Sequence, residues 1–459
     1  MHDSIVRIFV VLLLFVFFPG VGAPLQGAEN TENYIYSLKI DGNTINLNPP
    51  AVITANRALV PLRFMAENPV LDGQVYWDQK NQKVAIDCRG RYIELFIGQE
   101  SARVDGLSRR LETAPFIWKD RTYVPLRFLA ENLGGVVYWD AAKRGISVDF
   151  NYKPLVFAYY YYSPMEEVKS NIGLFTDIAF RWLSADGNGN LHYDYYDQYS
   201  QKIQWVQSQG VRAHASVALM DRDELHKLLN NPGNRHTLVQ QLAKLVSDYA
   251  YDGVNIDFEF IAPADGPAFT EFLQELKSAL GPGKILSAAV FARTGKENWA
   301  VAYDYAAIGR TADLVVVMAY DYRWLNSEPG PVAPLWWVKE VAAYMQSQMA
   351  GQKILLGLPT YGYDWSSDGS AKTVSLSTLK QLKSQYQVVE RFDQNSFSPY
   401  FTYCDQQGSC HEIWMENERS LNSKVAICLD QKLGGISFWR IGTGFVDLYK
   451  VLDQVKSVK

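Results

Sequence analysis

The stretch Asp252-Gly-Val-Asn-Ile-Asp-Phe-Glu259 decides the fold and the chemistry together. Side chains alternate between the two faces of a β-strand, so Asn255, Asp257 and Glu259 share one face and the apolar residues between them share the other. A polar row on a strand with an apolar reverse side predicts a strand packed on helices behind and open to a functional interior in front. Asp252 has the opposite parity, and we expect it to play a structural part at the start of the strand.

Seven further short apolar runs precede or follow this strand along the chain. They alternate with helix-like stretches, among them 221–249, 267–280 and 332–349. This alternation over residues 154–459 predicts a parallel sheet, and eight units predict an α/β fold of the (β/α)8 barrel type, with its chemistry at the carboxyl ends of the strands. Residues 359–434 are too many for one loop, so they are expected to hold the seventh helix and an inserted lobe. The predicted strands are 155–160, 177–182, 211–217, 253–258, 285–290, 314–319, 354–358 and 435–439.

Three motifs on these strands resemble glycoside hydrolase family 18, the chitinase-like family. Asp252 to Glu259 resembles its D-x-x-D-x-D-x-E motif, with Asn255 where most members have Asp. Met318-Ala-Tyr-Asp321 closes the sixth strand as the family's Met-x-Tyr-Asp does, and Trp439 ends the eighth strand, where the family places a tryptophan under the sugar. The resemblance covers residues 154–459 and implies a (β/α)8 barrel that hydrolyses glycosidic bonds.

The resemblance also assigns roles. It implies that Glu259 protonates the leaving oxygen and later activates water, while Asp257 orients the substrate's 2-acetamido group and Tyr320 hydrogen-bonds its oxygen. The acetamido carbonyl then replaces a protein nucleophile, as in substrate-assisted retaining hydrolysis. The aromatic residues after the seventh strand either line the cleft or only pack inside the inserted lobe. The candidate substrate-binding residues are Asn255, Met318, Asp321, Tyr361, Trp365 and Trp439.

Two departures from the chitinase pattern bear on the substrate. The third strand ends in Ser216-Val-Ala-Leu219 instead of Ser-x-Gly-Gly, and Gly357-Leu-Pro-Thr-Tyr-Gly-Tyr-Asp-Trp365 follows the seventh strand. Residues 357–365, together with Asn255, look more like the branch directed at spore cortex and peptidoglycan. We expect a β-1,4 bond next to N-acetylglucosamine to be cut. A chitinase or an endo-β-N-acetylglucosaminidase on another polysaccharide, an inactive carbohydrate-binding protein and a pure scaffold are the alternatives; an intact Glu259 disfavours the last two.

The front of the chain is duplicated. Residues 59–68 (Leu-Val-Pro-Leu-Arg-Phe-Met-Ala-Glu-Asn) recur at 123–132, and each copy is followed by a Tyr-Trp-Asp, at 76–78 and 138–140. Each unit is predicted to form strand, short helix and strand, with the repeated Trp and Phe in the core. Residues 34–150 resemble the copper amine oxidase N-terminal-like domain, an α+β module here without a His or Cys cluster for copper. A spacer or an attachment to the cell wall or a spore layer is the expected role.

Composition and the first residues indicate export. Residues 8–18 form an apolar run after Arg7 and before small residues, typical of a signal peptide over 1–28, which predicts a secreted, cell-surface or spore-associated protein. The 44 Lys and Arg nearly balance the 49 Asp and Glu, which argues against a nucleic-acid partner. Cys404 and Cys410 bracket a turn and are expected to form a disulfide, whereas Cys88 and Cys428 are expected to be buried free thiols. We expect a monomer that needs no cofactor or metal.

Overall fold

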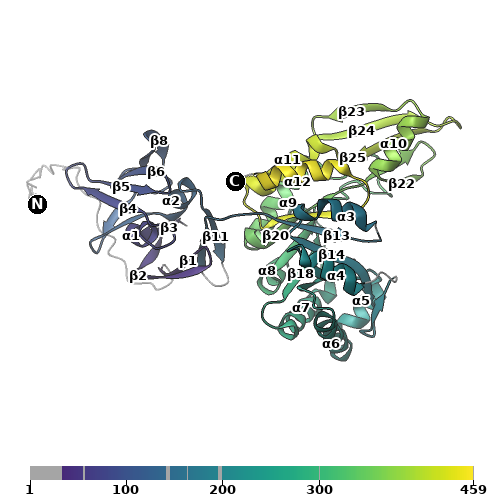
Figure 1. Cartoon of the computed structure of the whole chain (residues 1–459), viewed down its shortest axis with the longest axis horizontal. Coiled ribbons are helices and arrows are strands. Elements are labelled where there is room, and N and C mark those ends of the chain that lie inside the picture. The colour runs from purple at the N-terminus through teal and green to yellow at the C-terminus, as the bar shows by residue number, and fades with distance from the viewer. Residues whose placement is uncertain are drawn as a thin grey trace, which may run out of the picture.

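The computed structural model describes residues 34–54, 57–140, 145–162, 164–194, 199–298 and 300–457. Residues 34–150 form a strand-rich front domain, and residues from 155 onward form the barrel with an antiparallel lobe (Figure 1). The predicted signal peptide over residues 1–28 lies outside the described residues. Among the described residues, no helix has the length and apolar character needed to cross a membrane.

Eight parallel strands close into a barrel. Their order is β13-β26-β20-β19-β18-β17-β16-β14, and pairing of β13 with β14 closes the ring. All eight predicted strands are confirmed, with ends that differ by no more than three residues, because each buried run is apolar and bounded by turn residues. The strands are β13 (Leu155–Tyr160), β14 (Asp177–Ala185), β16 (Arg212–Leu219), β17 (Gly253–Phe258), β18 (Ile285–Phe291), β19 (Leu314–Met318), β20 (Ile354–Pro359) and β26 (Gly435–Ile441). The short β15 (Leu191–Tyr193) pairs antiparallel with the end of β14.

Helices cover the outside of the barrel. The helix-like stretch 221–249 holds two helices, because Pro232 opens the second helix and Asn231 caps it by accepting the N–H groups of Gly233 and Asn234. The helices of this part are α3 (Met165–Asn171), α4 (Tyr199–Ser208), α5 (Arg222–Leu229), α6 (Pro232–Asp248), α7 (Gly266–Leu280), α8 (Tyr305–Thr311), α9 (Leu335–Gln348), α11 (Glu418–Asp430) and α12 (Val446–Ser457). Three 3-10 turns accompany them: η2 (Ile172–Leu174), η3 (Pro263–Asp265) and η4 (Gly351–Lys353).

The two faces of β17 divide as their parity predicts. Phe258 is fully buried on the outer face and stacks on Phe272 of α7, with ring centroids 5.4 Å apart. On the inner face, the Asn255 amide accepts a hydrogen bond from Ser216 Oγ at 2.9 Å and donates one to Ser287 Oγ at 3.0 Å. These bonds form a polar layer across β16, β17 and β18, so the buried amide is satisfied.

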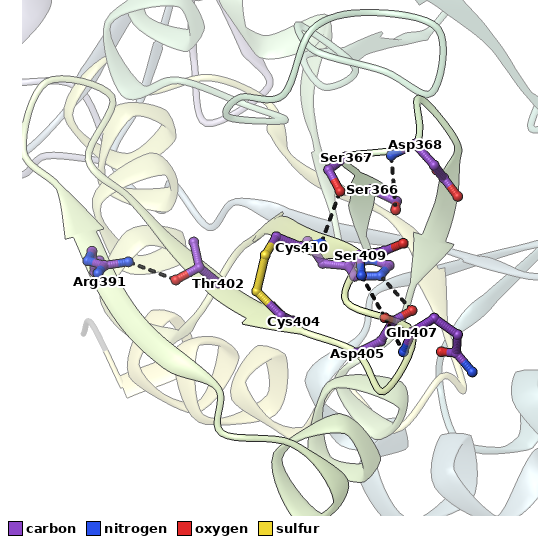
Figure 2. The surroundings of a disulfide bond; sticks show 11 residues. Ser366, Ser367, Asp368, Arg391, Thr402, Cys404, Asp405, Gln407, Ser409 and Cys410 are labelled. Carbon is purple, nitrogen blue, oxygen red and sulfur yellow. Dashed lines mark hydrogen bonds and ion pairs between the residues drawn. A yellow bond between two sulfur atoms is a disulfide. The ribbon is translucent and has the colours of Figure 1, made fainter.

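The inserted lobe is an antiparallel sheet that follows β20. Its order is β22-β21-β25-β24-β23, with helix α10 (Leu376–Gln385) beside it and α11 leading back to the barrel. The predicted disulfide joins Cys404 to Cys410 across the β24–β25 turn, where Asp405 accepts the N–H groups of Gln407 and Ser409 (Figure 2). Cys88 and Cys428 are buried free thiols, as predicted. The strands are β21 (Gly362–Ser366), β22 (Ala371–Val374), β23 (Val389–Asp393), β24 (Ser398–Cys404) and β25 (Cys410–Met415).

The front domain holds two sheets, β11-β12-β1-β2-β3-β10-β9 and β4-β5-β6-β7-β8. Its two repeats are β3-α1-β4-β5 and β10-α2-β11-β12, each with a short helix as predicted, although strands dominate the domain more than the α+β expectation implied. The elements are β1 (Tyr34–Ile40), β2 (Asn43–Thr54), β3 (Arg57–Pro61), α1 (Leu62–Ala66), β4 (Gln74–Asp78), β5 (Lys83–Cys88), β6 (Arg91–Phe96), β7 (Ser101–Val104), β8 (Leu107–Arg110), β9 (Phe116–Trp118), β10 (Arg121–Pro125), α2 (Leu126–Asn132), β11 (Val136–Asp140) and β12 (Gly145–Asp149).

Candidate active site

A cleft of about 790 Å³ opens at the carboxyl ends of the barrel strands. This is the end of a (β/α)8 barrel at which functional side chains gather, because loops of variable sequence leave the rigid strands there. The structure brings most of the sequence-predicted site residues to its wall. Those that line it are Asp257, Glu259, Met318, Tyr320, Asp321, Tyr361 and Trp439.

Two carboxyl groups from β17 stand at the bottom of this cleft. Asp257 is 5% exposed, and Glu259 directly follows the strand, where its N–H donates to the Leu219 carbonyl at 3.0 Å. Burial, together with the negative charges of Asp257 and Asp321, raises the pKa of Glu259 to about 8. Burial also raises the pKa of Asp257, but Arg181 opposes that rise. Glu259 therefore holds a proton at neutral pH.

Arg181 is a site residue that the sequence analysis did not single out. It lies on β14, with its Nε 3.6 Å from Asp257 Oδ2 and its Nη1 2.6 Å from Asp194 Oδ2. Its side chain is 12% exposed, so the guanidinium is a nearly buried positive charge that favours ionisation of Asp257. Parity gives a signal that would have found it, since Arg181 shares the inner face of its strand with Asp177 and Ala179.

Tyr320 and Asp321 follow β19 into the cleft. The backbone of Asp321 has φ 58°, a left-handed conformation that is uncommon for a residue other than glycine and turns the chain sharply after the strand. Its carboxylate accepts the hydroxyls of Tyr361 at 2.5 Å and Tyr363 at 2.8 Å. Enclosure in the cleft raises the pKa of Asp321, and the two hydroxyls oppose this rise. A Cβ on Gly357 would lie 2.6 Å from the Val317 carbonyl oxygen and 3.3 Å from the Tyr320 ring, so glycine lets β20 approach both the β19 backbone and that tyrosine.

Trp439 lies on β26 among aromatic side chains from β13 and the loop after it. Tyr159 meets it edge to face at 5.5 Å between ring centroids, and Tyr161 stacks on it at 6.1 Å. Among the four consecutive tyrosines from 159 to 162, Tyr159 is the one that lines the cleft, whereas Tyr160 packs in the outer core. The indole is thereby held from two sides as one wall of the cleft.

Three predicted residues do not line the cleft. Asn255 is fully buried in the polar layer beneath Asp257. Trp365 is 6% exposed and belongs to a buried cluster with Tyr363 and Trp414 of the inserted lobe and Val332, which precedes α9, so it packs the lobe and does not line the cleft. Asp252 accepts Gln207 Nε2 at 3.0 Å and the Ala213 N–H at 2.8 Å, in line with its expected structural part.

The cleft also has an apolar rim that sequence motifs did not reveal. Phe260 and Trp324 are about half exposed there, at 51% and 48%, although large apolar side chains normally avoid water. Exposed aromatic faces beside a polar floor suit a flat ligand with both apolar and hydroxylated surfaces. Within the described parts of the chain, no group of three or more His, Cys, Asp or Glu is arranged to hold a metal ion.

Comparison with known proteins agrees with this geometry. The sequence profile of glycosyl hydrolases family 18 matches residues 156–444, which is the barrel together with its inserted lobe. The chain belongs to glycoside hydrolase family 18. The copper amine oxidase N-terminal domain profile matches residues 39–148 in the front domain.

Relatives within family 18 extend the comparison. The chain is 34% identical over 235 residues to the cortical fragment-lytic enzyme of Bacillus anthracis, which covers 50% of this chain and 55% of that protein. The chain thus spans about half the length of the curated relatives it matches. The crystal structure of the Bacillus cereus spore cortex-lytic enzyme SleL superposes with a TM-score of 0.61 at 27% identity, over 67% of this chain and 75% of that one. The chitinase from Chromobacterium violaceum ATCC 12472 gives 0.62 at 26% identity, over 67% and 100%.

Proposed function

We propose that this protein is a secreted glycosidase that cleaves β-1,4 bonds next to N-acetylglucosamine in peptidoglycan, with spore cortex as its substrate. The observation that carries the proposal is the pair of carboxyl groups that β17 places in the cleft: Asp257 faces Arg181, and Glu259 directly follows the strand. Burial and the neighbouring negative charges raise the pKa of Glu259 to about 8, which favours its protonated form. A glycosidase acid needs such a raised pKa to donate a proton near neutral pH. The similarity to enzymes named for lysis of spore cortex supports this polymer over others.

In the proposed reaction, Glu259 donates its proton to the glycosidic oxygen as the bond to the anomeric carbon breaks. The carbonyl oxygen of the substrate's 2-acetamido group forms the new bond to that carbon, which gives a cyclic oxazolinium intermediate. Water then attacks the same carbon, the bond to the acetamido oxygen breaks, and the two displacements together give retention. Asp257 orients the acetamido N–H and balances the positive charge, and Tyr320 donates to the acetamido oxygen. Glu259, now ionised, takes a proton from the attacking water and is ready for the next cycle.

Other cleft residues position the sugar. Trp439, held by Tyr159 and Tyr161, offers a flat face for the apolar side of the pyranose ring. Asp321 accepts two tyrosine hydroxyls and still has lone pairs for sugar hydroxyls. Met318 lies beside them on the cleft wall. Asn255 lies beneath Asp257. Because its side chain is a neutral amide, it adds no second negative charge next to the Asp257 carboxylate.

Export and attachment complete the proposal. A polymer outside the cell requires a secreted or spore-associated enzyme, and the predicted signal peptide over residues 1–28 supports this location. The front domain would attach the enzyme to the cell wall or a spore layer. Export by the signal peptide and attachment by the front domain are both separate from the chemistry of the cleft.

A chitinase or another endo-acting N-acetylglucosaminidase is the second candidate. The observation that favours it is the superposition on the Chromobacterium violaceum chitinase, which is as close as that on the cortex-lytic structure. The exposed aromatic rim at Phe260 and Trp324 suits a chain of unsubstituted sugars as well as a peptidoglycan strand.

Mass spectrometry of the products separates these candidates. Wild type, Glu259→Gln and a control, Glu340→Gln, which changes an exposed carboxylate on α9, are incubated with purified cortex peptidoglycan or with chitin oligosaccharides. We expect soluble fragments with N-acetylglucosamine at the new reducing end from peptidoglycan only, lost in Glu259→Gln and kept in the control. Products from chitin alone would support the chitinase. Binding without products from either polymer would contradict the enzyme and favour a sugar-binding protein.

A further inference from the structure

The front domain carries two grooves related by its internal repeat. Residues 57–66 and 121–130 have the same order of exposed and buried positions, residue for residue. Strands β3 and β10 pair antiparallel with Val60 opposite Val124, two residues that are equivalent in the repeat. The two copies are therefore related by a local two-fold axis through this pair, and any surface built by one copy recurs in the other.

Each groove combines residues from both repeats. The first groove is lined by Arg63 and Trp77 of the first repeat and by Arg121 of the second. The second groove is lined by the equivalent side chains with the repeats exchanged. These equivalent side chains are Arg127, Trp139 and Arg57. One tryptophan and two arginines thus form the shared framework of the grooves.

The two tryptophans are exposed, which corrects the expectation that they belong to the core. Trp77 is 41% exposed and Trp139 is 40% exposed, whereas the apolar residues that precede α1 and α2 are buried. Burying an indole is favourable, so two equivalent indoles left in water indicate a surface completed by a ligand. An indole face packs well against a sugar ring or another flat group.

The charges in the grooves favour an anionic ligand. In each groove the arginines outnumber the carboxylates by one. Arg57 pairs with Glu112 and Arg63 pairs with Glu67, but Arg121 and Arg127 form no ion pair within the part of the chain that the structure describes. A guanidinium without a partner offers a planar pair of donors that matches a carboxylate.

We propose that the two grooves are equivalent binding sites for a carboxylate-bearing glycan, with the sugar on Trp77 or Trp139 and the carboxylate on Arg121 or Arg127. This proposal rests on the proposed function, because it takes the ligand to be the polymer that the barrel cleaves, whose peptide stems supply carboxylates. A repeating polymer presents the same unit many times, which suits a domain with two copies of one site. Two weak sites on one chain then hold an insoluble substrate through avidity.

Co-sedimentation with purified peptidoglycan tests this directly, using the full chain with Glu259→Gln so that the polymer is not digested. The double variant Trp77→Ala/Trp139→Ala and the double variant Arg121→Glu/Arg127→Glu are compared with the parent and with Tyr92→Ala. Tyr92 is a matched control because it is 44% exposed on the same domain but lies on β6, outside both grooves. We expect each double variant to bind at least about tenfold more weakly, a modest share of the avidity that two linked sites can supply, and the control to bind like the parent.

The nature of the ligand is tested by changing the polymer. Amidation of the peptidoglycan carboxyl groups should weaken binding of the parent and remove the difference between the parent and the arginine variant. Equal binding of all variants to untreated peptidoglycan would overturn the proposal, and equally strong, arginine-independent binding to neutral chitin would overturn the carboxylate part. With Glu259 restored, the variants should still hydrolyse small soluble fragments, so failure of groove binding is distinguishable from failure of the proposed hydrolysis.

Discussion

Arg181→Met tests the electrostatics of the cleft. The substitution keeps an apolar stem of similar length on β14 but removes the positive charge whose Nε lies 3.6 Å from Asp257 Oδ2. Ionised Asp257 then loses its nearby cation, so its pKa rises. Since the proposed mechanism needs Asp257 ionised and Glu259 protonated, the acidic limb of kcat/KM should move to higher pH. The basic limb should move in the same direction by less, because Arg181 also lowers the pKa of Glu259, but more weakly than burial, Asp257 and Asp321 raise it.

The size of this shift follows from the distance. At an effective dielectric constant of about 20, two unit charges 3.6 Å apart attract by about 4–5 kcal/mol, an upper limit of about three pKa units. Asp194 shares the same guanidinium at 2.6 Å and weakens its field at Asp257. We therefore expect a shift of about one to two units, which narrows the pH profile and lowers its maximum.

The assay is kcat/KM on a soluble peptidoglycan fragment between about pH 4 and pH 9, the range that brackets both limbs. Arg181→Lys should move the limb less, because it keeps a charge without the guanidinium geometry. Arg235→Met is the matched control, since it removes a nearly buried arginine that pairs with Glu271 and Glu275 on α7, away from the cleft. A folded Arg181→Met enzyme whose acidic limb does not move would show that Arg181 does not control the ionisation of Asp257.

Three further predictions concern the cleft and the buried ion pair of Lys424 and Glu416. Asn255→Asp places a second carboxyl group under Asp257 and should also raise the apparent pKa of the acidic limb. An unchanged pH profile would contradict this prediction. The basic limb should have an apparent pKa near 8, set by Glu259, and a limb far below that value in a pH series would contradict the assignment. Lys424→Met should destabilise the barrel by about 3–5 kcal/mol in denaturant unfolding, because it leaves Glu416 buried without its partner at 2.6 Å, and a loss under about 1 kcal/mol would count against it.

The sequence predicted the barrel because each strand is a buried apolar run that local pattern alone describes. The same parity placed Asp257 and Glu259 on the inner face of β17, where they are found. Parity places Arg181 on the inner face of β14, but it does not identify the partners of the guanidinium, Asp194 and Asp257, which are distant along the chain.

Aromatic residues were harder to place than carboxylates. Tyr361 and Trp365 lie four residues apart around the start of the inserted lobe, yet only Tyr361 reaches the cleft. Whether an indole packs in a lobe or faces a ligand depends on the sheet that covers it, which pattern alone does not specify. For the same reason the exposure of Trp77 and Trp139 emerged only from the folded front domain.

The central claim is that the substrate's own acetamido group is the nucleophile, with Glu259 as acid and base. The most direct measurement is the initial rate of the wild-type enzyme on one soluble cortex oligosaccharide before and after removal of the N-acetyl group at the scissile sugar. If the acetamido group is the nucleophile, the wild-type enzyme should cleave the deacetylated substrate no faster than Glu259→Gln cleaves the acetylated substrate. Equal rates of the wild-type enzyme on both substrates would contradict it, because a protein carboxylate would then have to attack the sugar.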